Sequence, residues 1–124
     1  MGDLIQHEFE ALRSASFRDH DGLILRDGSW TAETLAAWRE RFRNDPAKIE
    51  AVINHVHLRV LYWQPSNPTL DEVRAIGWQI RDAWHETLRI SFPARQFQVV
   101  FEDTLAEDGS LDDFQITAFE VREV

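Results

Sequence analysis

Two histidines and an arginine occupy alternate positions in a stretch rich in β-branched and aromatic residues. They are His55, His57 and Arg59, within residues 51–63. Side chains at alternate positions of a β-strand point to the same side of a sheet, so this spacing offers two imidazoles to one metal ion. Two nitrogen ligands do not make a site, and a third would have to come from another element, for instance from Asp19, His20, Asp21 or His85. We therefore predict no metal centre and no cofactor.

An anionic ligand suits the same three side chains equally well, because imidazoles and a guanidinium donate charge-assisted hydrogen bonds. A plainer interpretation also stays open, in which His55 and His57 line a polar sheet face or donate to nearby carboxylates and carbonyls. We name His55, His57 and Arg59 as candidate ligand-binding residues. Such a domain could be enzymatic, since imidazoles titrate near neutral pH and can act as general acid and base.

Trp78 is the second unusual residue, because it lies off the apolar stripe of the helix predicted around it. Arg74, Arg81 and His85 lie near it at helical spacings of four, three and seven residues. A tryptophan among arginines is typical of protein–protein interfaces. Alternatively, another part of the chain covers Trp78, or Arg74 stacks on its ring. We name Arg74, Trp78, Arg81 and His85 as candidate interface residues.

Charge is distributed unevenly along the 124 residues, which carry a net charge of −9. Eight acidic residues and Arg122 lie between Glu102 and Val124, a net of −7, which leaves −2 for the first 101 residues. The net negative charge argues against nucleic-acid binding through a basic surface. The acidic C-terminal residues could instead attract a basic partner. The acidic stretch 107–113 lacks the ligand spacing of a calcium loop, so we expect a solvated hairpin loop.

Familiar catalytic patterns are missing from the sequence. There is no Gly-x-Ser-x-Gly elbow, no phosphate-binding glycine loop, no His-Glu-x-x-His and no cysteine. We predict no catalytic residue and do not favour an enzyme. The sequence has no apolar run long enough to span a membrane and no signal-peptide pattern at its start, so we expect a single soluble cytoplasmic domain over residues 1–124.

The elements that must position these residues follow from periodicity. Alternation predicts a long strand over 51–63, which the prolines of 64–68 stop. Thr69, with Glu72 three residues later, forms a capping-box pattern at the start of the longest amphipathic helix, which we expect to end before Pro93. Its apolar stripe runs from Leu70 to Leu88 and includes Trp84 at a core position.

Shorter elements surround this unit. We expect helices from Asp3 to about Ser16 and from Thr31, a short strand or hairpin arm at 23–25, and strands over 95–103 and 113–122. Asn44 to Pro46 ends the second helix, and Asp45 with Pro46 caps one further helical turn. Opposite apolar faces in the last strand suggest a bulge between Thr117 and Phe119.

Together these elements predict an α+β fold. We expect a mixed three- to four-stranded sheet with a β-α-β unit and a C-terminal hairpin, and with helices packed mainly on one face. The favoured function is protein–protein contact, as a homodimer or by docking on a basic partner, with no nucleic-acid or membrane partner. The alternative is ligand or metal binding at the face of His55, His57 and Arg59.

Overall fold

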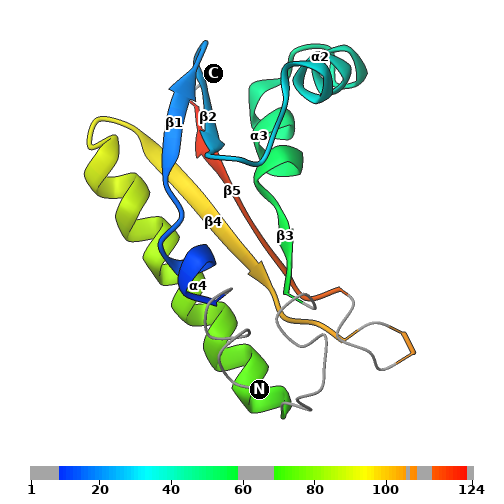
Figure 1. Cartoon of the computed structure of the whole chain (residues 1–124), viewed down its shortest axis with the longest axis vertical. Helices are drawn as coiled ribbons and strands as arrows, with labels where there is room; N and C mark the ends of the chain where they lie inside the picture. The colour runs from blue at the N-terminus through cyan, green and yellow to red at the C-terminus, as the bar shows by residue number, and fades with distance from the viewer. Residues whose placement is uncertain (1–8, 59–68, 106, 109–112, 123–124) are drawn as a thin grey trace.

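The fold is α+β, as predicted. The structure, a computed structural model, describes residues 9–58, 69–105, 107–108 and 113–122. Residues 9–13 are helical, and the elements after them are β1 (Phe17–His20), β2 (Leu23–Arg26), α2 (Ala32–Arg41), α3 (Pro46–Asn54), β3 (Val56–His57), α4 (Leu70–Ser91), β4 (Gln96–Glu102) and β5 (Gln115–Val121) (Figure 1). None of the described helices is both long and apolar enough to cross a membrane.

The strands form two small sheets rather than one. Strands β1 and β2 make an antiparallel hairpin whose turn residues, Asp21 and Gly22, both have positive φ angles, 53° and 88°. This is the backbone that an Asp-Gly hairpin turn requires. The second sheet has the order β3-β5-β4, and both of its ladders are antiparallel.

The predicted β-α-β unit is present in altered form. Strands β3 and β4 each run antiparallel to β5, so they are parallel to one another, and α4 connects them. The C-terminal strand β5 lies between the two parallel strands, a position that the sequence did not indicate. The predicted C-terminal hairpin of β4 and β5 is confirmed. Its register runs without interruption from Gln96↔Val121 to Glu102↔Gln115, so the predicted bulge is wrong.

Helix α4 matches its prediction closely. Thr69 is the N-cap and forms the capping box with Glu72, and the helix ends at Ser91, before Pro93. The helix packs against the sheet through a buried stripe of Val73, Gly77, Ile80, Trp84 and Leu88. Trp84 is fully buried, and its indole Nε1–H donates to the Leu12 carbonyl at 2.8 Å.

The predicted long strand over 51–63 is wrong in its first half. Asp45 caps α3, Pro46 opens it, and the helix continues to Asn54, leaving Val56–His57 as the paired strand. Residues 59–68 lie outside the described residues. The buried residues of the helix are Ile49, Glu50, Ile53 and Asn54, which lie at positions i, i+1, i+4 and i+5. This is the spacing of one helix face, so a helical period fits the segment as well as alternation does.

Two buried polar side chains of α3 join the two sheets. Asn54 accepts a hydrogen bond from the Arg26 amide and donates to the carbonyls of Ile24, in β2, and Ala118, in β5. Glu50 accepts from the amides of Ile24 and Glu120 in the same two strands. Strands β2 and β5 are not hydrogen-bonded to each other, so these two side chains supply the hydrogen bonds that their facing amides and carbonyls need.

The Glu50 carboxylate is fully buried and paired with Arg122. Two guanidinium nitrogens of Arg122 donate to Glu50 at 2.9 and 2.8 Å, and this bonding raises the pKa of Arg122. A buried carboxylate requires such partners, since an isolated buried charge is strongly destabilising. Helix α3 is therefore held against the sheets by these polar bonds and by the packing of Ile49 and Ile53 on Leu23 and Leu25, and this contact positions the residues of the groove described below.

Candidate functional site

The predicted interface residues lie along one side of α4, next to strand β4. Trp78 is 47% exposed, and its ring meets the Phe101 ring edge-on, with centroids 5.4 Å apart. Arg81 donates from Nε to the Val99 carbonyl at 3.2 Å. His85 and Phe97 line the same shallow pocket of about 320 Å³. Trp78, Arg81 and His85 thus lie beside alternate residues of β4.

Among the described strands, β4 is at the edge of its sheet, with β5 on one side only. The Glu120 amide and the Ala118 carbonyl point toward α3, where Glu50 and Asn54 bind them. In an antiparallel ladder, the residues opposite, Phe97 and Val99, must then turn their amides and carbonyls away from β5. The outer edge of β4 therefore presents backbone hydrogen-bonding groups next to Trp78.

Arg81 is the residue that occupies this edge. Within the described part of the chain, its bond to Val99 is the one side-chain hydrogen bond to the outer edge of β4. Its guanidinium also pairs with Asp82 at 3.0 Å. Arg74, the fourth candidate, lies 3.7 Å from the Asp103 carboxylate, beyond the end of β4, rather than stacking on Trp78. The cluster is thus partly engaged within the chain, while the Trp78 ring stays half exposed.

His55 and His57 do lie together, although not on one long strand. His55 is the C-cap of α3 and His57 ends β3, and their rings meet edge-on with centroids 5.0 Å apart. The His55 Nδ1 lies 2.6 Å from the Val52 carbonyl. Because a carbonyl can only accept, Nδ1 must carry a hydrogen, and Nε2 is left for another partner. Arg59 lies outside the described residues.

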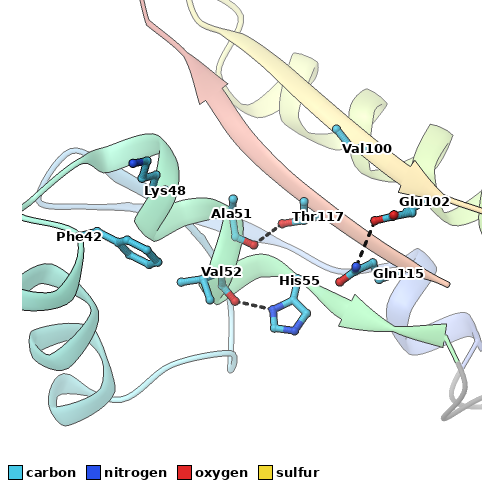
Figure 2. Close-up of a pocket in the computed structure, with 9 residues that line it drawn as sticks. All are labelled: Phe42, Lys48, Ala51, Val52, His55, Val100, Glu102, Gln115 and Thr117. Atoms are coloured by element: carbon cyan, nitrogen blue, oxygen red, sulfur yellow. Dashed lines mark hydrogen bonds between the residues drawn. The ribbon is translucent and has the colours of Figure 1, made fainter. Parts of the chain in front are cut away.

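An open groove of about 430 Å³ begins at His55. One wall is a stripe of α3 at positions i, i+3, i+4 and i+7, formed by Lys48, Ala51, Val52 and His55. The opposite wall comes from Val100 and Glu102 of β4 and from Gln115 and Thr117 of β5, and Phe42 closes one end (Figure 2). A strand over residues 51–54 would not form this groove, since only a helix brings Lys48 into line with His55.

The polar groups of the groove are partly paired. Thr117 donates its hydroxyl to the Ala51 carbonyl, and Gln115 donates to Glu102 at 3.2 Å, as the dashed lines in Figure 2 show. The lining is otherwise mainly apolar: Phe42, Ala51, Val52 and Val100. A groove of this size, mostly apolar with a few polar groups, has the general character of a small-molecule site.

The suggested third metal ligands are engaged elsewhere. His20 packs on Trp30, with ring centroids 4.4 Å apart, and Asp19 pairs with Arg95 at 2.8 Å. His85 lines the pocket beside α4. In the described ranges, no group of three or more histidine or acidic side chains gathers where it could hold a metal ion. Most of the acidic stretch 107–113 lies outside those ranges; Glu107, Asp108 and Asp113 are exposed.

Comparison with protein-family models, with curated proteins and with solved structures found no match for this chain.

Proposed function

We propose that this protein acts through protein–protein contact, with the outer edge of β4 and the exposed Trp78 ring as its contact surface. The observation that carries the proposal is the alignment of Trp78, Arg81 and His85 along an edge whose backbone groups face outward. An extended segment that pairs with such an edge gains main-chain hydrogen bonds, and neighbouring side chains supply the specificity. Trp78 provides an aromatic anchor beside them.

The partner is an extended segment of another protein, with an apolar side chain against Trp78. A second copy of this chain fits less well, because antiparallel pairing of two β4 strands about Val99 would bring both Arg81 side chains to the same place. The net charge of −9 favours encounter with a partner of positive charge. Arg81 would release the Val99 carbonyl when the partner binds, so it protects the edge in the free protein.

The test uses peptides selected on the wild-type protein from a displayed random library. We expect Trp78→Ser to weaken the selected peptides about tenfold or more, as removal of an interface anchor does. Ile90→Ser is the matched control, since Ile90 is 64% exposed on the same helix but lies outside the edge cluster. Equal binding to the wild type and to Trp78→Ser would contradict the proposal.

Amide hydrogen exchange locates the contact at single residues. Peptide binding should protect the amides of Phe97 and Val99, which face outward, and leave those of Gln98 and Val100 unchanged because β5 already binds them. Protection elsewhere, without a change at Phe97 and Val99, would place the contact on a different surface. Sedimentation of the free protein tests the homodimer, and a stable dimer lost in Trp78→Ser would replace the peptide with a second copy.

Ligand binding at the groove is a second candidate function. It is favoured by His55, a candidate ligand-binding residue from the sequence, which lines the groove and whose Nε2 has no hydrogen-bond partner among the described residues. His57 supports the His55 ring from the side.

A further inference from the structure

We infer that the groove between α3 and strands β4 and β5 binds a small amphipathic organic anion, with its acidic group at the α3 wall and its apolar body across the groove. This inference deepens the second candidate function and is independent of the contact proposed at β4. It rests on three features of the lining: an unpaired cation, a histidine with a fixed hydrogen position, and an apolar surface of ligand size.

Lys48 supplies the cation. It is the only lysine in the chain, and no described residue pairs with its ammonium group. Most arginines whose contacts the structure describes have acidic partners, among them Arg13, Arg18, Arg89, Arg95 and Arg122. In a chain of net charge −9, an exposed ammonium group on a groove wall that no described side chain pairs with is a natural site for an anion.

His55 lies two helical turns further along the same stripe, about 10 Å from Lys48 along the helix axis. Its Nδ1–H is held by the Val52 carbonyl, so the ring is fixed and its Nε2 is available to the ligand. A protonated His55 donates from Nε2 to an acidic group, whereas the neutral ring accepts from a ligand hydroxyl or amide. Both ends of the α3 wall can therefore meet polar groups of a ligand.

The apolar body of the ligand would lie between these two residues. Figure 2 shows Phe42 and Val52 close together on the α-helical side and Val100 across the groove on β4. Val100 is 38% exposed on the sheet face that α4 does not cover, so a ligand there would remove apolar surface from water. The volume of about 430 Å³ fits a molecule of two or three rings.

Glu102 sets the orientation of the ligand. Its carboxylate lies on the opposite wall, and its one described hydrogen bond in the groove comes from the uncharged Gln115. Like charges repel, so an acidic group is kept away from the β4 wall and directed to Lys48 and His55. This asymmetry distinguishes an anion from a neutral or cationic ligand.

The experiment compares two fluorescent probes with the same ring skeleton. 1-Anilinonaphthalene-8-sulfonate carries a sulfonate, and N-phenyl-1-naphthylamine does not. Both are titrated at pH 7 into folded wild type and into Lys48→Glu, Glu102→Gln and Val100→Asp. Arg13→Glu is the control for net charge, since Arg13 lies outside the groove and changes the charge by the same amount as Lys48→Glu.

We expect Lys48→Glu to weaken the sulfonate probe by about fivefold or more and to leave the neutral probe within about twofold, because one charge contact is reversed near the surface. Glu102→Gln should strengthen the sulfonate probe, Val100→Asp should weaken both probes, and Arg13→Glu should change neither. If both probes bind and Lys48→Glu affects them equally, the groove binds ligands but the anion assignment is wrong. If neither probe binds the wild type, the ligand-binding function fails with it.

Discussion

Helix α4 packs on the three-stranded sheet through apolar side chains, whereas α3 adds two buried polar side chains to its own apolar contacts, which Ile49 and Ile53 make with β2. The buried stripe of α4 contains Val73, Ile80 and Trp84, and its contacts are non-directional. The buried face of α3 contains Glu50 and Asn54, whose hydrogen bonds specify individual backbone atoms of β2 and β5. Apolar packing tolerates small shifts, but hydrogen bonds to specific backbone atoms do not, so α3 fixes the relative position of the two sheets.

The different ways in which α4 and α3 contact the sheet also determine where the candidate sites lie. The buried stripe of α4 packs on the sheet, and the neighbouring side of the helix lies along the outer edge of β4. Trp78 and Arg81 are on that side, where they contact Phe101 and Val99. Helix α3 contacts β5 but does not cover the face of β4 that is opposite α4, where Val100 and Glu102 are exposed. The groove is the space between α3 and this face of β4. Each candidate site is thus a by-product of how one helix meets the sheet.

Trp84→Ala should have the largest effect of the changes considered. We expect the free energy of unfolding to fall by about 3 to 5 kcal/mol, because a fully buried indole leaves a cavity and the Leu12 carbonyl loses its donor. Urea denaturation measures the change. Trp78→Ser, on the exposed side of the same helix, should cost about 1 kcal/mol or less. Similar losses in both variants would contradict the apolar packing assigned to α4.

Glu50→Ala tests the polar side of the comparison. The free energy of unfolding should fall by about 3 kcal/mol, because Arg122 loses its carboxylate and the amides of Ile24 and Glu120 lose their acceptor. The double variant Glu50→Leu, Arg122→Leu should be less unstable than the sum of the two single variants, since neither charge is then left alone. Additive losses in urea denaturation would show that the pair is not a coupled unit.

Gly77→Ala tests how tightly α4 meets β4. An added Cβ would overlap the Phe101 ring, which is itself held between Trp78 and Phe114. Alanine gains about 1 kcal/mol over glycine in helix propensity, but overpacking costs about 1 to 3 kcal/mol, so we expect a net loss of about 1 kcal/mol. A rise in thermal stability would mean that Phe101 can move aside.

Acid should weaken the contact between the β1–β2 hairpin and Arg95, with the smallest effect on stability of the changes considered. The Gly22 amide and the Arg95 guanidinium lower the pKa of Asp19. A carboxyl whose pKa is lower in the folded state stabilises the fold above its unfolded-state pKa, and this contribution is lost as the pH falls below about 4. Asp19→Asn should therefore reduce stability at pH 6 but not near pH 2. Urea denaturation at pH 6 and pH 2 measures the difference in free energy of unfolding between wild type and variant. An equal difference at both pH values would exclude this linkage.

The accuracy of the sequence predictions follows the same division between the two helices. The boundaries and buried stripe of α4 were predictable because the capping box and the apolar period are local and agree with one another. Residues 51–54 were not, because alternation and a helical period both fit them, and buried Glu50 and Asn54 do not indicate a core face; the cap at Asp45 and Pro46 and the strand at Val56–His57 were predicted. A helical interpretation of residues 46–54 would have placed Ile49, Glu50, Ile53 and Asn54 together.

The candidate sites were predictable in part. Trp78, Arg81 and His85 were named from helical spacing, and that spacing holds in α4. The position of β4 next to them was not accessible, since strand order is set by long-range pairing. His55 and His57 were named from a wrong strand, yet they remain neighbours because a helix C-cap followed by a short strand also brings their rings together.

The sequence by itself determined the α+β class, the helix that begins at Leu70, the short hairpin arm at 23–25, and the pairing of the last two strands, because each depends on residues close together in the chain. Tertiary structure decided that β5 lies between β3 and β4, that residues 51–54 are helical, and that Lys48 and His55 line one groove with Val100 and Glu102. Those outcomes depend on Glu50 and Asn54 finding backbone partners more than 20 residues away, which no local pattern encodes.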